Sequence, residues 1–101
     1  MDKNPVLVKF SKSQNSKKKM TAIFFNKDRK KIKTVHFGSK NMSDYTIHKN
    51  PERKQNYIKR HSVREDWNNP MTAGALSRFI LWNLPTLSSS IKDYKKRFNL
   101  K

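Results

Sequence analysis

The sequence contains no cysteine, and only two of its 101 residues are glycine. The absence of cysteine excludes disulfide bonds and thiolate metal sites. The two glycines, Gly38 and Gly74, lie far apart, which excludes a glycine-rich loop that cradles phosphate groups. The longest apolar runs, Ala22–Phe25 and Phe79–Trp82, are much shorter than the roughly 20 residues that a membrane-spanning helix needs.

The N-terminus also lacks the form of a secretory signal. The segment MDKNPVLVKF does not place a long apolar stretch after a basic one. From these absences we expect a soluble protein that stays inside the cell or is packaged in a particle made there.

Acidic residues are scarce, whereas lysine and arginine are abundant. The chain has 24 basic and seven acidic residues, which give a formal net charge of +17. This charge greatly exceeds what solubility requires, and it attracts polyanions over a Debye length of about 8 Å at physiological salt. Lysine outnumbers arginine, which favours neutralisation of phosphate groups over bidentate reading of bases. We therefore expect an acidic partner.

The basic residues occur in clusters, any one of which alone would be an ordinary solvated face. We predict that together they bind a polyanion, through Lys17, Lys18, Lys19, Arg29, Lys30, Lys31, Lys33, Arg53, Lys54, Lys59, Arg60 and Arg64. If about six of them contact phosphates, affinity for nucleic acid should fall with log salt at a slope near −5. No helix-turn-helix, RRM, KH or zinc-finger pattern is present, so the sequence does not support sequence-specific recognition.

The length predicts a single domain, residues 1–101, with a strand-rich part at 1–38 and a helical part at 39–101. Three short apolar runs predict strands at Val6–Phe10, Met20–Phe25 and Lys31–Phe37. The turn-forming residues Asn26–Lys30 join the last two runs into a hairpin, and the first run extends it to a three-stranded meander. Imperfect alternation predicts a bulge at Thr34–Val35.

Three short helices are predicted in the second part. Asn50 as N-cap and Pro51 at the first helical position begin a helix that runs to about Val63. A second, more apolar helix spans Thr72 to about Asn83, and Ser88–Ser90 begin the last one. The fold class is therefore α+β, a small antiparallel sheet followed by three helices that pack around Trp67, Phe79, Trp82 and Phe98.

The only plausible metal-binding or acid–base set consists of His36, His48 and His61 with Asp44, Glu65 and Asp66. The spacings between the histidines match no compact ligand motif. We therefore predict no catalytic residue, no metal, no cofactor and no small-molecule substrate. We expect His36 on a strand face, His48 fixing the loop before the first long helix, and His61 capping or packing.

An enzymatic alternative uses Tyr45 as a nucleophile beside His48, with His61 and Asp44, in a nuclease-like site. A buried tyrosine with a satisfied hydroxyl group is the commoner arrangement.

A long segment of the chain, from His36 to Asn99, also resembles a known family. The residues that carry the resemblance are Phe37-Gly38, Ser43–Thr46, His48-Lys49, Tyr57-Ile58, Arg60-His61, Trp67, Thr72–Gly74, Leu76–Arg78, Leu81–Asn83 and Lys96–Phe98. In this pattern the chain resembles small, basic, uncharacterised proteins encoded by large double-stranded DNA viruses that infect algae and protists. The resemblance implies a virion, reached through the host cytoplasm or nucleus during assembly.

Charge and resemblance together predict a non-enzymatic virion component, a minor capsid or internal protein that binds acidic surfaces through its Lys/Arg clusters. The expected partners are virion or capsid proteins, nucleic acid, or both. One alternative is a sequence-independent nucleic-acid-binding protein that condenses a genome or forms a ribonucleoprotein. The nuclease-like enzyme is the third hypothesis.

Overall fold

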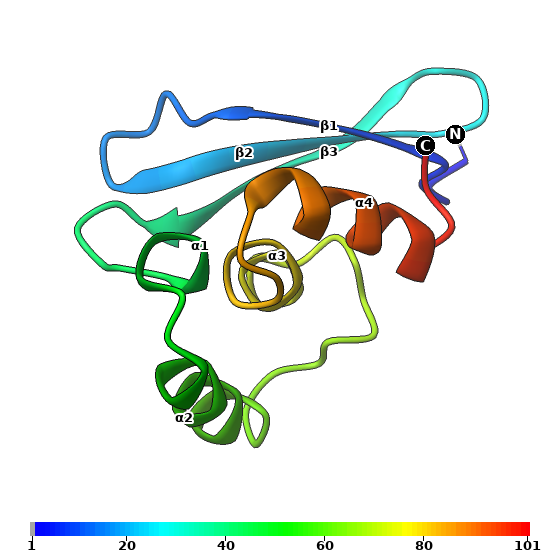
Figure 1. Ribbon diagram of the computed structural model, residues 1–101. Coiled ribbons are helices and arrows are strands. Elements are labelled where there is room, and N and C mark those ends of the chain that lie inside the picture. Colours follow the sequence, from blue (N-terminus) through cyan, green and yellow to red (C-terminus); the bar gives the residue numbers. More distant parts are fainter. Residues whose placement is uncertain (1) are drawn as a thin grey trace.

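The chain folds into two layers, a β-sheet and a group of helices that covers one face of it (Figure 1). The structure is a computed structural model and describes residues 2–101. The sheet has three antiparallel strands in the order β1-β2-β3. Their bounds are Leu7–Lys12 for β1, Lys18–Phe25 for β2 and Lys31–Ser39 for β3. The predicted α+β class and the three-stranded meander are therefore confirmed.

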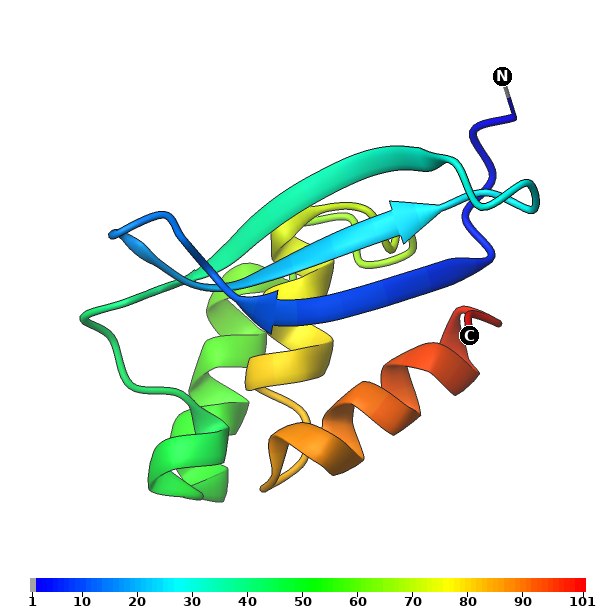
Figure 2. The same cartoon turned by 90° about the horizontal axis from the view of Figure 1, so that it is seen from above.

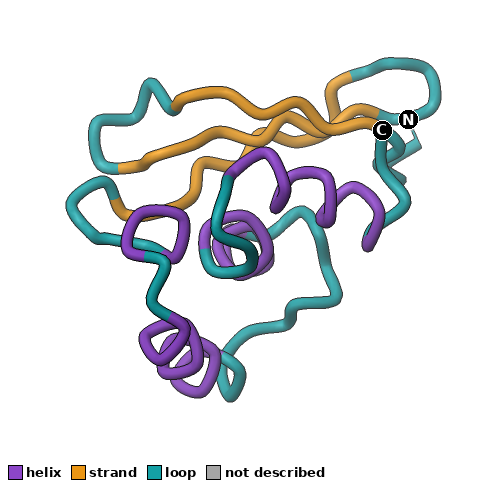
Figure 3. Tube along the Cα trace, viewed as in Figure 1, coloured by secondary structure: helices purple, strands orange, loops and turns teal. Residues whose placement is uncertain are grey.

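Five short helical segments follow the sheet within residues 2–101 (Figure 3). Their bounds are Tyr45–His48 for α1, Pro51–His61 for α2, Ala73–Leu76 for α3, Ser77–Leu81 for the π-helical turn η1 and Leu87–Arg97 for α4. The three predicted helices are present as α2, the continuous pair α3–η1, and α4. The one-turn helix α1 is additional, and it forms because the Asp44 carboxylate accepts a hydrogen bond from the Thr46 backbone N–H at 2.9 Å.

The bulge lies at a different position from the predicted one. Thr34 and Val35 pair in regular register with Ile23 and Ala22. The register shifts between Phe24 and Phe25, which leaves Ile32 as the extra residue of β3. Ile32 and Val35 are three positions apart, so in a regular strand their side chains would point to opposite faces. The bulge turns Ile32 toward the core, on the same side as Val35. The irregular alternation is therefore resolved at Ile32 and not at Thr34–Val35, where the sequence pattern predicted the bulge.

The helix starts are partly as predicted. The Asn50 side chain accepts hydrogen bonds from the Glu52 and Arg53 backbone N–H groups, with Pro51 at the first helical position of α2. The prediction for α4 is wrong, because Thr86 and not Ser88–Ser90 caps it. The Ser90 hydroxyl is buried and accepts a hydrogen bond from the Leu84 backbone N–H at 3.0 Å, so it stabilises the preceding turn instead.

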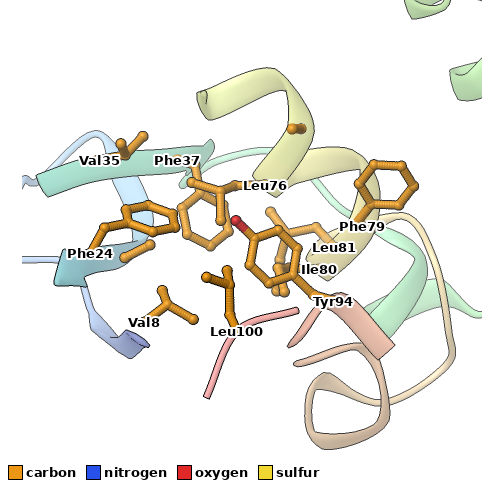
Figure 4. Packing of buried hydrophobic residues seen from close by; sticks show 12 residues of the cluster. Val8, Phe24, Val35, Phe37, Leu76, Phe79, Ile80, Leu81, Tyr94 and Leu100 are labelled. Carbon is orange, nitrogen blue, oxygen red and sulfur yellow. The ribbon is translucent and has the colours of Figure 1, made fainter. Parts of the chain in front are cut away.

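The core lies between the inner face of the sheet and the helices (Figure 4). Phe24 and Phe37 from the sheet meet Leu76, Ile80 and Tyr94, and all five are fully buried. Each such side chain contributes about 1.5–3 kcal/mol through burial. Of the predicted core residues, Phe79 is buried, whereas Trp67, Trp82 and Phe98 are partly buried and pack against its edge. The sheet's own phenylalanines occupy the centre.

The C-terminal residue Lys101 pairs with the chain at the start of β1, at the edge of the sheet. The Val8 backbone N–H donates to the Lys101 carbonyl at 3.0 Å, and the Lys101 backbone N–H donates to the Val6 carbonyl at 3.0 Å. The helices lie on one side of the twisted sheet, and in Figure 2 the opposite face is turned toward the viewer without a covering element. Within residues 2–101, no helix has the length and apolar character needed to cross a membrane.

Candidate polyanion-binding cleft

Most of the basic side chains are not neutralised inside the molecule. Among the lysine and arginine residues of the described chain, Lys19 and Arg97 form ion pairs. The Lys19 Nζ lies 2.5 Å from Asp44 Oδ2, and Arg97 Nη2 lies 3.4 Å from Asp93 Oδ2. The remaining basic residues leave a large surplus of charge available to a partner.

The predicted clusters occupy separate places on the fold. Residues 29–33 lie at the β2–β3 turn, and residues 17–18 lie at the β1–β2 turn, at the opposite end of the sheet (Figure 1). The cluster of residues 53–64 lies on α2 and the turn that follows it. The long dimension of the molecule is 42 Å, so the two ends of the sheet are well separated in space.

Lys19 differs from the rest of the predicted set. Its side chain is only 16% exposed, and its ammonium is paired with Asp44, whose side chain is 3% exposed. The same carboxylate caps α1 through Thr46. Lys19 therefore fastens β2 to α1, and its charge is already neutralised.

The fold brings two of the distant clusters to one cleft. One hollow of about 260 Å³ is lined by Lys18 and Arg60, and a second of about 370 Å³ is lined by Arg53 and Arg60. The two hollows are neighbours that share Met42, Ser43, Arg60 and Trp82 as lining residues, and we name them together the basic cleft. Its polar and charged lining residues are Lys18, Lys19, Ser39, Asn41, Ser43, Asp44, Arg53, Asn56, Tyr57, Arg60, His61, Glu65 and Ser77. The two carboxylates of this set have partners within the molecule, Lys19 for Asp44 and His61 for Glu65.

A column of aromatic rings supports one wall of this cleft. The Tyr57 ring stacks on Trp82 with centroids 4.4 Å apart and an interplanar angle of 2°, and His61 stacks on Tyr57 at 4.1 Å. His48 lies against Trp82 at 5.2 Å. Burial raises the pKa of the Tyr57 hydroxyl above its usual value, so this group stays protonated. The rings of Tyr57 and Trp82 each lie between two others, so their faces are not free to stack on a ligand.

Glu65 fixes His61 at the rim of the cleft. Its Oε1 lies 3.0 Å from His61 Nδ1, and its Oε2 accepts a hydrogen bond from Trp67 Nε1 at 2.7 Å. Gly74 leaves room for this carboxylate, since a Cβ atom there would lie 3.0 Å from it. The predicted packing role of His61 is confirmed, and the carboxylate holds its ring in a single orientation.

His48 fixes the turn between α1 and α2, as predicted. Its Nδ1 accepts a hydrogen bond from the Asn50 backbone N–H at 2.9 Å. Burial lowers the pKa of His48 below its usual value, and the positive charge of Arg53 lowers it further. The ring is therefore neutral at pH 7, with its proton on Nε2.

His36 lies on the exposed face of the sheet, again as predicted. Its Nδ1 shares hydrogen bonds with the Thr21 hydroxyl at 2.8 Å and the Ser13 hydroxyl at 3.0 Å. Its contacts are separate from those of His48 and His61, and it does not line the basic cleft.

The residues of the nuclease-like alternative are brought together only in part, since the Tyr45 ring lies edge-on to His48 with centroids 6.2 Å apart but His61 is separated from both. His48 and His61 lie at opposite ends of the column, with the rings of Trp82 and Tyr57 between them. Asp44 is committed to Lys19 and to the cap of α1. Among residues 2–101, no group of three His, Asp or Glu side chains is placed to hold a metal ion.

Sequence reasoning missed the polar residues that line the cleft between the basic ones. Asn41 and Asn56 belong to no motif, and Ser43 was noted only as part of the family resemblance; their convergence depends on how α2 packs beside the end of the sheet. The only signal in the sequence is their nearness to basic clusters.

Among the comparisons with known proteins, one found a match, which covers the first part of the chain. A family model described as a family of unknown function (DUF5754) matches residues 8–61, which is more than half of the chain and contains the sheet, α1 and α2. Searches of the curated proteins and of the solved structures found no match.

Proposed function

The chain belongs to the DUF5754 family, and we propose that it is a non-enzymatic structural component of a virion that binds an acidic partner through its basic surface. The viral setting is supported by the resemblance of residues 36–99 to small basic proteins of large double-stranded DNA viruses. The chemistry is supported by the distribution of charge on the folded chain.

The observation that carries the proposal is the shortage of internal partners for the basic side chains. The net charge is +17, and within residues 2–101 only Lys19 and Arg97 of the 24 lysines and arginines are ion-paired. Such a charge opposes the compact state through self-repulsion, and an acidic partner relieves this repulsion. A minor capsid or internal protein meets such a partner during assembly.

We propose the basic cleft as the binding site for anionic groups of the partner. Lys18, Arg53 and Arg60 reach it from β2 and α2, and Asn56 and Ser43 add neutral donors. Charge-assisted hydrogen bonds from such groups suit carboxylate and phosphate oxygens. Because the ring faces of Tyr57 and Trp82 are occupied, the cleft favours contact with anionic groups over stacking with bases.

A second candidate function, sequence-independent nucleic-acid binding, is favoured by the separation of the basic clusters. The cluster at the β2–β3 turn and the basic cleft lie at opposite ends of the sheet. Two separate basic sites on one small domain allow it to bridge two stretches of a duplex, as a genome-condensing protein does.

The test compares binding to a short DNA duplex with binding to poly-glutamate, each measured by fluorescence anisotropy between about 50 and 200 mM salt. We expect Arg53→Ala with Arg60→Ala to weaken binding about tenfold or more. The control pair, Lys92→Ala with Lys96→Ala on exposed positions of α4, removes the same charge outside the cleft and should weaken it much less.

Equal losses of affinity in the two double variants would show that the cleft contributes no more to binding than any other basic surface. Absence of binding to both polyanions at low salt contradicts the proposal as a whole. Copurification with a capsid protein at low salt, or with nucleic acid, decides between the two candidate functions.

A further inference from the structure

An apolar hollow lies next to the basic cleft, and Lys19, Asp44 and Leu81 line both. It has a volume of about 330 Å³, and its apolar walls come from β2, α1, η1 and α4. Its apolar lining residues are Met20, Ile47, Leu81 and Leu87, and Lys12 lies at its rim. Figure 2 shows α1 and the first turn of α4 on the same side of the sheet.

Two of its apolar side chains are exposed although the core lies close by. Ile47 is 63% exposed and Leu87 is 39% exposed, whereas Leu81 between them is 3% exposed. The exposed pair therefore extends an apolar strip outward from the core. Grouped exposed apolar side chains around a concave surface are typical of a site that another molecule covers.

The charges around the hollow indicate the chemistry of that molecule. Lys12 is exposed at the rim, and the Lys19–Asp44 pair in the wall is internally neutral. The rest of the chain adds a strongly positive field from its net charge of +17. The complementary ligand is therefore an apolar side chain with acidic residues on either side of it.

Other occupants fit this chemistry less well. A second copy of the chain carries the same charge of +17, so like-charge repulsion opposes its approach. A nucleic-acid backbone satisfies the lysines but presents no large apolar group to the hollow. A protein segment supplies both groups.

We propose that the apolar hollow receives a large apolar side chain from an acidic segment of a protein partner, whose carboxylates face Lys12. The inference rests on the proposed function, because it assumes that an acidic partner binds this chain. It specifies that the partner at this face is a protein. It also attributes the affinity for that partner to the burial of an apolar side chain together with attraction between charges.

Two short labelled peptides of aspartate and glutamate test the proposal. One carries a central leucine and phenylalanine, and the other carries serine at both positions. Against the wild-type protein we expect the apolar peptide to bind about tenfold more tightly, because the hollow buries an apolar side chain. The double variant Ile47→Ser with Leu87→Ser should bind both peptides equally.

The matched control is Val63→Ser, which alters a side chain that is 81% exposed and does not line the hollow. It should keep the tenfold preference. All three substituted positions are surface-exposed, and thermal melting of each variant verifies that the fold is retained.

Equal affinity of the two peptides for the wild-type protein overturns the inference. If sedimentation shows a dimer that Ile47→Ser with Leu87→Ser dissociates, a second copy covers the hollow and the inference is again overturned. In both cases binding to the DNA duplex and to poly-glutamate stays intact, so the proposed function survives. Failure of the wild-type protein to bind any of these polyanions contradicts the proposed function itself.

Discussion

Asp44 is the residue on which the local geometry at the end of the sheet depends. It is 2% exposed, pairs with Lys19, and caps α1 through the backbone N–H and hydroxyl of Thr46. A buried carboxylate requires such partners, since an unpaired charge in the interior is strongly destabilising. Asp44 therefore joins β2 to α1 beside both the basic cleft and the apolar hollow.

We expect Asp44→Ala to lower the free energy of unfolding by about 3–5 kcal/mol, because it leaves the mostly buried Lys19 ammonium without its partner. Urea denaturation measures this loss. Asp28→Ala removes an exposed carboxylate and changes the net charge equally, so it should be nearly neutral. Similar losses in the two variants would show that the pair is unimportant.

A second prediction at this scale concerns pH. The pKa of His48 is lowered in the folded state from its usual value of 6.5, chiefly by burial. The unfolded chain therefore binds more protons at this group, so its contribution to stability is complete above about pH 6.5 and is lost as the pH falls toward the folded-state pKa.

The measurement is urea denaturation at a series of pH values around 6.5, with wild-type protein and His48→Gln. The wild-type curve should fall more steeply on acidification, and His36→Gln, on the exposed face of the sheet, should resemble the wild type. If the His48→Gln variant loses stability on acidification as steeply as the wild type, His48 is not the cause of the pH dependence.

Among the elements, α2 carries Arg53 and Arg60, two of the basic residues of the cleft. A small set of side-chain contacts holds this helix against the rest of the fold. Tyr57 on α2 stacks on Trp82, which directly follows η1, and His61 is held by Glu65. The π-helical turn η1 buries the consecutive residues Phe79, Ile80 and Leu81, and Trp82 then projects toward α2. The position of the cleft therefore depends on the join between η1 and α2.

Trp82→Ala should release α2 from the rest of the fold, because it removes the ring on which Tyr57 stacks. We expect amide hydrogen exchange to become at least about tenfold faster in α2, while the strands stay protected. Phe98→Ala, which removes the ring that packs against Phe79 and Tyr94, is the control and should leave exchange in α2 unchanged. Uniformly faster exchange in the Trp82 variant would indicate global destabilisation instead.

For the whole molecule, charge and core act in opposite directions. The core is formed by a small set of residues between one sheet and the helices, and it is surrounded by a surface of net charge +17. Self-repulsion at low salt opposes this compact state, whereas screening or a bound polyanion relieves it. The stability of the chain should therefore depend on its ionic surroundings.

We expect the melting temperature to rise when salt is increased from about 50 to 200 mM, and to rise further with poly-glutamate at constant ionic strength. Differential scanning fluorimetry measures both changes. Poly-lysine, which cannot neutralise the surface, is the control and should have no such effect. A melting temperature that falls with salt would mean that internal ion pairs dominate stability.

The sequence by itself determined those features that depend on neighbouring residues. The strand order followed from short apolar runs separated by turns, and the start of α2 followed from Asn50 and Pro51. The cap of α4 was misplaced because the three serines at 88–90 resemble caps, while Ser90 is in fact buried against the turn before the helix. The charge of the chain needed no structure at all.

The tertiary structure alone decided which basic residues act together. Lys18 and Arg60 are 42 positions apart and meet in one cleft, whereas Lys19, next to Lys18, is paired with Asp44. It also decided that Ile47 and Leu87 share one hollow, because α1 and α4 pack against the same end of the sheet. Local patterns report the conformation of a few successive residues, but convergence depends on how helices pack onto a sheet, and that packing is set by the whole core at once.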